Sequence, residues 1–178
     1  MSSKAKEALK SIGVLCLIAA LSGLLLGFMN RLTYVDPLKE AMSKFNELYG
    51  KEITFELKAE NQGDIVYMAV GDEGGEEVYA ILSEGKGGYK GSVQMYVFIK
   101  EDKIVSLYSG ENSETFMNKL EEAKFYDNFI GKDLQDIRAF KPDAVSSATK
   151  SSTAVTDAVN KAVDFYKAYK ITEGEGNE

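Results

Sequence analysis

The 178-residue chain contains no histidine and a single cysteine, Cys16. One cysteine can neither form an internal disulfide nor supply the thiolates that hold an iron–sulfur cluster. Without histidine, the chain also lacks the side chain that ligates most haem groups and the usual zinc sites. We therefore expect no metal site, and any redox group of this protein must be organic or must belong to a partner.

Charged side chains are missing from one long stretch near the N-terminus. Residues 11–29 contain none, and Arg31 closes this apolar run. As a helix the run spans roughly 28 Å, close to the thickness of a bilayer core. A cleaved signal peptide has a similar basic start and apolar centre, but no Ala-x-Ala site follows this run. Cys16 is no lipoprotein acceptor, because Leu15 precedes it where a small residue is expected. We predict an uncleaved transmembrane helix over residues 11–30.

The charges beside this run predict its orientation. Residues 1–10 carry three lysines against one glutamate, and such a segment favours the cytoplasmic side. The expected protein crosses the cytoplasmic membrane once, with residues 1–10 in the cytoplasm. Residues 31–171 then form one extracytoplasmic domain, and residues 172–178 form a flexible acidic tail.

Acidic side chains dominate the part of the chain beyond the apolar run. Residues 1–31 carry a net charge of +3, so the net charge of −7 leaves −10 for residues 32–178. Such a domain does not attract nucleic acid, and we expect no nucleic-acid partner. The acidity also fits a role in solubility alone.

Local patterns predict both helices and strands in residues 31–171. Asp36 suits the N-cap of a helix, Pro37 suits its first position, and Gly50 suits its end. From residue 52 onward the apolar residues form short β-prone runs, and a polar loop joins the last two as in a hairpin. These runs cover residues 53–57, 65–70, 78–82, 92–100 and 104–108.

Small and hydroxylated residues fill the stretch from Asp143 to Lys150, before a segment with helical periodicity that begins at Val155. The oxygens of Ser, Thr and Asp at such a place usually accept hydrogen bonds from the unpaired amides of a helix start. The stretch therefore predicts a capped helix. The same amides and the positive helix end also suit a phosphate, and the spacing alone does not choose between these two interpretations.

The order Asp-x-x-Ser-Ser-Ala-Thr over residues 143–149 resembles the flavinylation sequence Asp-x-x-(Ser/Thr)-Gly-Ala-Thr of the FMN-binding domain family. In that family a flavin transferase joins FMN through a phosphoester to the hydroxyl of the final threonine. The resemblance implies covalent FMN on Thr149. Ser147 stands where glycine is usual, and serine lacks the freedom of glycine at positive φ. The implied neighbours of the cofactor in this stretch are Asp143, Ser146, Ser147, Ala148 and Lys150.

Two further elements resemble the same family. Residues 85–91 are rich in glycine but match neither a Walker A sequence nor a dinucleotide fingerprint, so by themselves they suit a flexible turn or a ligand loop. Within them, Gly-Tyr-Lys-Gly at 88–91 is similar to a Gly-Tyr-x-Gly element of the family, and Tyr89 could pack on an aromatic ring. Glu114 and Thr115 match the first half of a Glu-Thr-Pro-Gly sequence that lies by the flavin. Here Phe-Met replaces Pro-Gly, and the same segment also suits the start of a helix.

The three motifs fall in the order of the family, which implies one α+β domain with an antiparallel sheet and packed helices on a single N-terminal transmembrane helix. The family includes flavin-carrying subunits of two membrane complexes, the Rnf ion-translocating complex and the sodium-translocating NADH:quinone reductase. Because this chain lacks long insertions, it is more similar to the short Rnf member of the family. The resemblance implies an electron-transfer subunit of an Rnf-type ferredoxin:NAD oxidoreductase, with no catalytic residue of its own.

The implied partners are the other subunits of that complex, the flavin transferase and the membrane. Two alternatives stay open. The first is a flavoprotein subunit of another respiratory chain, such as one similar to the NADH:quinone reductase. The second is a cofactor-free, membrane-anchored assembly module.

Overall fold

The computed structural model describes residues 3–34, 36–51, 53–135 and 138–175, and the chain divides into two compact units, residues 1–40 and 41–178. The first unit contains helix α1 (Ser3–Thr33), whose large apolar side chains are 46–72% exposed. An apolar helix of this length can cross a membrane, and a signal sequence near an N-terminus has the same features. The predicted helix is confirmed, and its role as an uncleaved anchor stays a prediction.

Helix α2 (Pro37–Tyr49) begins and ends where the local chemistry predicts. The amide of Leu38 donates to Oδ1 of Asp36 over 3.1 Å, which is the expected N-cap bond. At the other end, Gly50 has φ of +72°, and its amide donates to the carbonyl of Asn46 over 3.1 Å. Glycine adopts this left-handed conformation without the penalty that a side chain carries, so the helix stops there.

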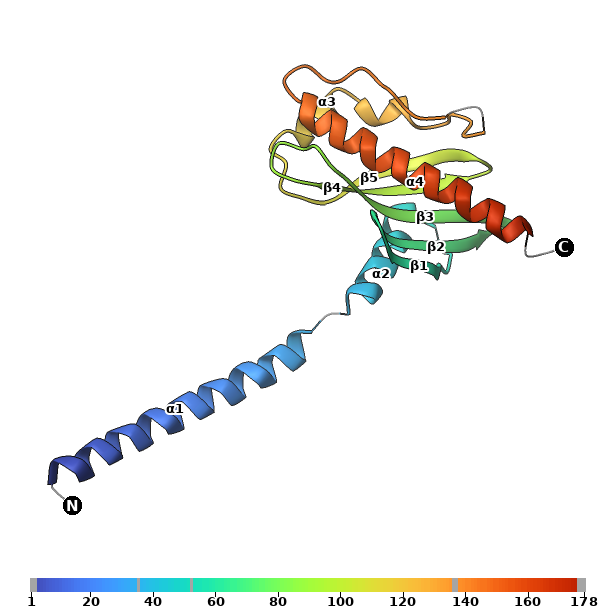
Figure 1. The fold of residues 1–178 in the computed structure, drawn as a ribbon. Helices are drawn as coiled ribbons and strands as arrows, with labels where there is room; N and C mark the ends of the chain where they lie inside the picture. The colour runs from blue at the N-terminus through green and yellow to red at the C-terminus, as the bar shows by residue number, and fades with distance from the viewer. Residues whose placement is uncertain (1–2, 35, 52, 136–137, 176–178) are drawn as a thin grey trace. The chain divides into compact units, whose positions relative to one another are not determined.

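The second unit is built on five antiparallel strands that follow one another in chain order across a single sheet (Figure 1). The α+β prediction is therefore confirmed, as is the hairpin between the last two strands. The first strand begins later than predicted, because residues 53–55 precede the ladder. The strands are β1 (Glu56–Gln62), β2 (Ile65–Glu73), β3 (Glu76–Gly85), β4 (Val93–Lys100) and β5 (Lys103–Asn112).

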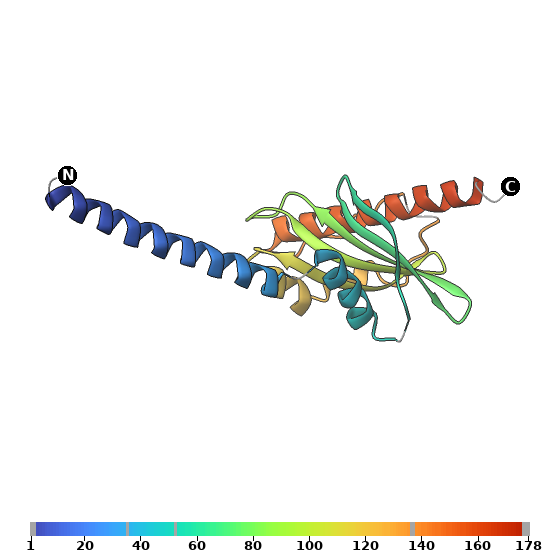
Figure 2. The ribbon, with the colours of Figure 1, turned by 90° about the horizontal axis from the view of Figure 1, so that it is seen from below.

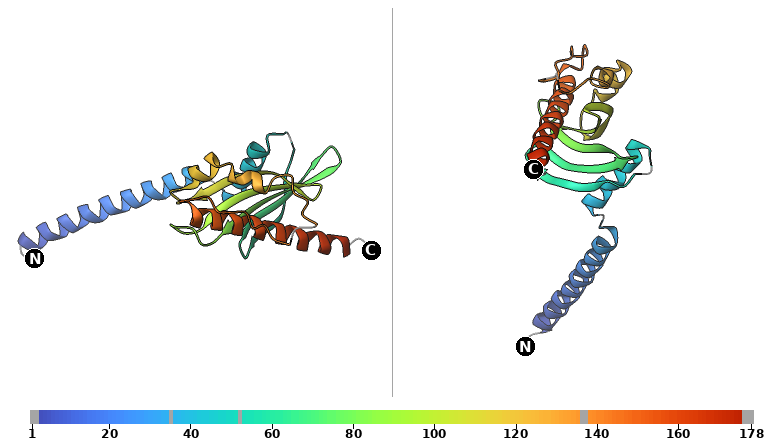
Figure 3. Two further views of the ribbon diagram at one scale, coloured as in Figure 1. Left: turned by 90° about the horizontal axis from the view of Figure 1, so that it is seen from above. Right: turned by 90° about the vertical axis from the view of Figure 1, so that its right-hand side faces the viewer.

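Helices cover both faces of the sheet. Helix α4 (Thr149–Glu175) crosses one face, and residues 41–49 of α2 lie on the other (Figures 2 and 3). Side chains alternate between the faces along a strand, so Met95 and Val97 of β4 belong to the core under α4, while Phe98 meets Phe45 of α2 at a ring distance of 6.0 Å. Helix α3 (Met117–Glu122), the 3₁₀ helix η1 (Phe125–Asn128) and the following coil complete the core on the α4 side.

Helix α4 has one continuous buried face, as the periodicity from Val155 predicts. Its buried apolar side chains are Ala154, Val155, Ala158, Val159, Ala162, Val163 and Tyr166. The helix continues to Glu175, so residues 172–175 of the predicted tail are helical, and the flexibility of the tail stays a prediction. Within this last part of the helix, the hydroxyl of Thr172 donates to the carbonyl of Ala168 over 3.0 Å. Residues 176–178 of the predicted tail lie outside the described residues.

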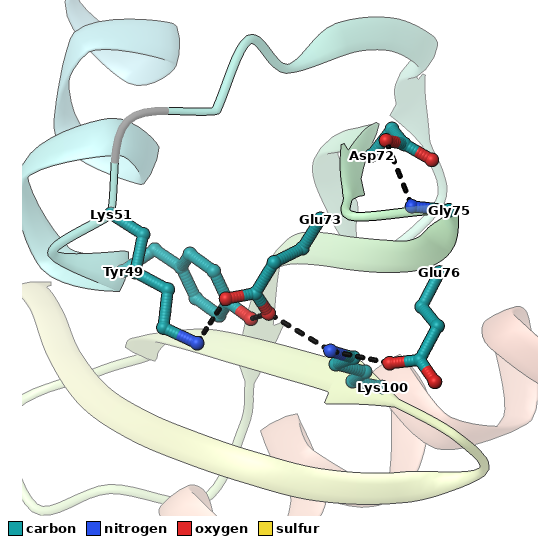
Figure 4. Close-up of polar contacts among 7 residues, drawn as sticks. All are labelled: Tyr49, Lys51, Asp72, Glu73, Gly75, Glu76 and Lys100. Carbon is teal, nitrogen blue, oxygen red and sulfur yellow. Dashed lines mark hydrogen bonds and ion pairs between the residues drawn. The ribbon is translucent and has the colours of Figure 1, made fainter.

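A charged cluster joins the end of α2 to the β2–β3 hairpin and to β4 (Figure 4). Glu73 accepts hydrogen bonds from the hydroxyl of Tyr49 over 2.7 Å and from Nζ of Lys100 over 3.0 Å, and it also pairs with Lys51. Lys100 pairs with Glu76 over 2.6 Å as well. The bonds from Lys51, Tyr49 and Lys100 lower the pKa of Glu73 to about 2. The cluster therefore holds α2 and the hairpin together while Glu73 is ionised.

Candidate functional site

A groove of about 290 Å³ lies at the N-terminus of α4. Residues 147–151 line it together with two aromatic rings, those of Tyr89 and Phe116. The ring centroids lie 6.4 Å apart at an angle of 67°. Tyr89 is 64% exposed, so most of its ring is open to a ligand. The fold thus brings the glycine-rich loop, the segment before α3 and the hydroxylated stretch to one place.

A tight turn precedes α4, and Ser147 is its critical residue. The amide of Ala148 donates to the carbonyl of Val145 over 3.0 Å, which closes a four-residue turn with Ser147 in its third position. Ser147 has φ of +64°. Turns with positive φ at this position favour glycine, because a side chain makes this conformation unfavourable. Serine is therefore an unusual residue here. The hydroxyl of Ser147 accepts a hydrogen bond from Nζ of Lys119 over 2.9 Å.

The predicted hydroxyl cap of this helix is wrong. Helix α4 begins at Thr149, so the cap position falls on Ala148, whose side chain has no oxygen. Ser152 instead accepts from the amide of Val145 over 3.1 Å and donates to the carbonyl of Ala148 over 3.0 Å. The first backbone hydrogen bond of the helix also joins these two residues, because the amide of Ser152 donates to the carbonyl of Ala148. The amides of residues 149–151 therefore have no acceptor within the helix, and they suit an anion.

Thr149 is the hydroxyl of this stretch that is best placed for modification. It is exposed, it lines the groove, and in the described part of the chain its hydroxyl makes no hydrogen bond. Ser146 is also exposed but does not line the groove. The remaining hydroxyls are engaged: Ser147 with Lys119, Ser151 with Glu114, Ser152 with Val145 and Ala148, and Thr153 with the carbonyl of Thr149.

Glu114 bridges the glycine-rich loop and the first turn of α4. Its Oε1 accepts from the amide of Lys90 over 2.6 Å, and its Oε2 accepts from the hydroxyl of Ser151 over 2.7 Å. Burial acts to raise the pKa of Glu114, but the bonds from Lys90 and Ser151 outweigh it, and the pKa is lowered. A Cβ on Gly88 would lie 2.5 Å from Oε1 of Glu114. The first glycine of the Gly-Tyr-Lys-Gly element is therefore needed for the close approach of this carboxylate.

The same loop is also fixed at its start. The amide of Lys86 donates to Oδ2 of Asp157 on α4 over 2.7 Å. Just before it, a Cβ on Gly85 would overlap the carbonyl oxygen of Ala154 and lie 2.5 Å from the amide nitrogen of Ala158. The end of β3 thus packs directly on the backbone of α4, and both ends of the loop that carries Tyr89 are fixed to other elements.

Two lysine ammonium groups lie over the aromatic rings of the groove. Nζ of Lys150 is 5.7 Å from the centroid of Tyr89, and Nζ of Lys119 is 4.8 Å from that of Phe116. Both distances are those of cation–π contacts. These ammonium groups give the region of Thr149 a local positive charge, although residues 32–178 carry a net charge of −10.

Of the residues predicted for the site, Tyr89, Ser147, Ala148, Thr149 and Lys150 line the groove. Asp143, Ser146, Glu114 and Thr115 do not line it, and their contacts with a cofactor stay predictions. Sequence reasoning missed the residues Phe116, Lys119 and Ser151. Phe116 could have been identified from the sequence, because it takes the place of proline in the Glu-Thr-Pro-Gly sequence of the family. Lys119 could not, because it contacts Ser147 across 28 residues.

The groove has aromatic and anion-binding features that suit FMN. The exposed ring of Tyr89 and the ring of Phe116 suit the isoalloxazine, and the free amides of residues 149–151 with Lys150 suit the phosphate. Residues 88–164 match the FMN-binding domain family, a range that contains every residue lining the groove. No curated protein matches the chain. Residues 88–164 are therefore similar to an FMN-binding domain, and the groove beside Thr149 is the candidate flavin site of this part of the chain.

Proposed function

We propose that this protein carries FMN covalently on Thr149 and transfers electrons as a subunit of a membrane complex of the Rnf type. The observation that carries the proposal is the position of Thr149. Its hydroxyl, which makes no hydrogen bond to the described residues, lies in the first turn of α4, in a groove shared with two aromatic rings. The domain family and the geometry support a bound flavin, and the flavinylation sequence supports the covalent bond.

Attachment would form a bond between Oγ1 of Thr149 and the flavin phosphorus and break the phosphorus–oxygen bond to a leaving group. The hydroxyl proton is lost, so the chain gains one FMN less one water. The amides of residues 149–151 lie next to this oxygen, so the chain offers hydrogen-bond donors and a positive helix end where the phosphate negative charge would be. Lys150 adds a cation at the same place. These local groups offset the repulsion that a domain with a net charge of −10 exerts on an anionic cofactor.

The flavin supplies the redox chemistry when it is bound, and the side chains hold and orient it. Tyr89 and Phe116 offer ring surfaces beside the attachment point, and Glu114 fixes the loop that carries Tyr89 to the helix that carries Thr149. No side chain has to act as an acid, a base or a nucleophile toward a diffusing substrate. The chain thus suits a carrier that exchanges electrons with redox groups of neighbouring subunits.

Membership of an Rnf-type complex rests on two features of the chain. Helix α1 would anchor the domain in the membrane, and the chain has no room for the long insertions of the related quinone reductase protein. Ferredoxin oxidation would occur on other subunits, because one cysteine and no histidine cannot ligate iron–sulfur clusters. NAD reduction would occur there too, because the glycine-rich residues 85–91 match no dinucleotide fingerprint. The domain would lie on the outer face of the cytoplasmic membrane, coupled to sodium or proton translocation by its partners.

Covalent attachment is tested by producing the chain together with a flavin transferase and denaturing it in SDS. The wild-type band should show flavin fluorescence, and its intact mass should rise by one FMN less one water. Thr149→Val should lose both signals while Thr149→Ser retains some flavin. The matched control Thr153→Val, one turn later on α4 and outside the groove, should behave as wild type. Flavin on Thr149→Val would show a different acceptor. A wild-type chain without flavin would favour the cofactor-free assembly module.

The complex is tested by purifying the protein from its own membranes. Copurified subunits that reduce NAD with reduced ferredoxin, and lose this activity in Thr149→Val, would support the Rnf type. Quinone reduction by NADH in the same preparation, without ferredoxin dependence, would place the protein in another respiratory chain instead.

A further inference from the structure

Ser147 occupies a backbone conformation that usually requires glycine, and its side chain makes a hydrogen bond that glycine could not make. Its φ of +64° places its backbone in the left-handed region. Glycine adopts this region freely, and Asn and Asp adopt it occasionally, but other residues do so at a cost. A turn with serine at this position is therefore intrinsically less stable than the same turn with glycine. Something outside the turn has to offset the difference if the turn is to be held in one conformation.

Lys119 is the group that contacts this serine from outside the turn. Its Nζ donates to Oγ of Ser147 over 2.9 Å, so a charged donor meets the side chain that glycine would lack. The lysine is itself held, since its Nζ lies 4.8 Å from the ring centroid of Phe116. The short helix that carries Lys119 is anchored in the core by Leu120, which is fully buried. The contact thus ties the turn to the core of the domain.

The turn in question sets the position of Thr149. The hydrogen bond from the amide of Ala148 to the carbonyl of Val145 closes the turn, and α4 begins at the next residue. A change of conformation at Ser147 would therefore displace Ala148, which is buried, and would move the hydroxyl of Thr149 relative to Tyr89.

We infer that Lys119 is a positioning residue for the flavin acceptor: its hydrogen bond to Ser147 holds the turn in the conformation that presents Thr149. This inference rests on the proposed attachment of FMN to Thr149. In this chain the acceptor turn depends on a lysine that comes 28 residues earlier, whereas a turn with glycine would hold the same conformation without it.

The test measures the rate of flavin incorporation by a purified flavin transferase, followed by intact mass. Lys119→Met keeps the apolar stem over Phe116 but removes the donor, and Ser147→Ala removes the acceptor but keeps the unfavourable φ. Each should slow incorporation about three- to tenfold, and the double variant should be no slower than either alone. Lys119→Arg, which retains a donor, should restore the rate. Lys132→Met, at an exposed lysine, serves as the control.

Ser147→Gly distinguishes a positioning role from a general loss of stability. Glycine adopts positive φ freely, so Ser147→Gly should incorporate flavin at the wild-type rate or faster. In that background Lys119→Met should have no further effect, which is the coupling that a double-mutant cycle detects. All rates are compared at a temperature at which circular dichroism shows every variant folded.

Equal rates for wild type and Lys119→Met would overturn the inference. Lys119→Met could also slow flavin incorporation equally in the wild-type and Ser147→Gly backgrounds. That result would overturn the inference too, because the lysine would then act independently of the Ser147 side chain. Either result leaves the proposed function standing, since the wild-type chain still takes up flavin. A wild-type chain that takes up none under the same conditions would overturn the proposed function itself, and this inference with it.

Discussion

Replacing Glu114 with alanine should release the glycine-rich loop from α4. The carboxylate receives the amide of Lys90 over 2.6 Å and the hydroxyl of Ser151 over 2.7 Å, and alanine offers neither acceptor. A hydrogen bond to a charged group contributes about 1.5–3 kcal/mol when it is well buried. Glu114 is only half-buried, so solvent weakens both bonds, and together they stabilise the closed loop by about 2 kcal/mol. The opening equilibrium of the loop should therefore rise about 30-fold.

Hydrogen exchange measures this opening directly. The amide of Lys90 should exchange about 30-fold faster in Glu114→Ala than in wild type, while the amide of Lys86, which donates to Asp157, and those of β3 and β4 keep their protection. Glu114→Gln should fall between the two, because its carbonyl can accept from Lys90 and its amide can donate to Ser151. The matched control Glu111→Ala removes an exposed carboxylate from the same segment and should leave the loop unchanged. Unchanged exchange in Glu114→Ala would refute the bridging role of this side chain.

The protonation state of Glu114 provides a second check on the same bridge. Its pKa in the folded protein is lowered, by hydrogen bonds that outweigh the effect of burial. A lowered pKa means that the bridge contributes its full stability above the unfolded value, which lies near 4.3 for glutamate. That contribution is lost as the pH falls through the folded pKa. Loop protection, corrected for intrinsic exchange, should therefore decline in acid for wild type and stay flatter for Glu114→Gln.

Three further predictions concern other parts of the domain. Gly85→Ala should lower the free energy of unfolding in urea by about 3 kcal/mol, because its Cβ would overlap the backbone of α4 at Ala154. Glu73→Gln should flatten the decline of stability in acid. In wild type the pKa of Glu73 is lowered to about 2, so its contribution is present above about pH 4.3 and lost as the pH falls toward 2. Tyr89→Ala should change the visible spectrum of the attached flavin while the melting temperature stays within about 2 °C, because Tyr89 is 64% exposed.

Elements that depend on local chemistry could be predicted from the sequence. Helix α2 follows from Asp36, Pro37 and Gly50, each of which acts within a few residues of its position. The order and number of the strands follow in the same way, from β-prone runs separated by turn residues. The resemblance added Thr149, which no propensity or periodicity could distinguish from the neighbouring hydroxyls.

The contacts that build the site could not be predicted, because they join distant parts of the chain. Glu114 meets Lys90 and Ser151 across 24 and 37 residues, and no spacing rule covers such distances. The resemblance favoured Glu114 as a flavin neighbour, whereas the structure assigns both of its oxygens to the protein itself. The local sequence Glu114-Thr115 does not indicate which amide will donate a hydrogen bond to the carboxylate.

The hydroxylated stretch misled the prediction of the cap for a different reason. Serine and threonine favour the N-cap, but their hydroxyls can also donate to the carbonyl four residues earlier once the chain is helical. Ser152 and Thr153 both do so, over 3.0 Å each. The helix can therefore begin at Thr149, before these hydroxyls, with Ala148 at the cap. The consequence is that the amides of residues 149–151 are left for an external acceptor.

The geometry of the groove gives a reason for a covalent bond. Ligand pockets usually enclose about 300–1,000 Å³, and this groove of about 290 Å³ is smaller than most of them. Residues 32–178 also carry a net charge of −10, which opposes an anionic cofactor at long range. A groove this small, in a domain of this net charge, would hold free FMN weakly despite the local cations Lys119 and Lys150. The proposed phosphoester to Thr149 would remove the need for tight enclosure. The ring could then stay accessible beside Tyr89, as the proposed electron exchange with another subunit requires.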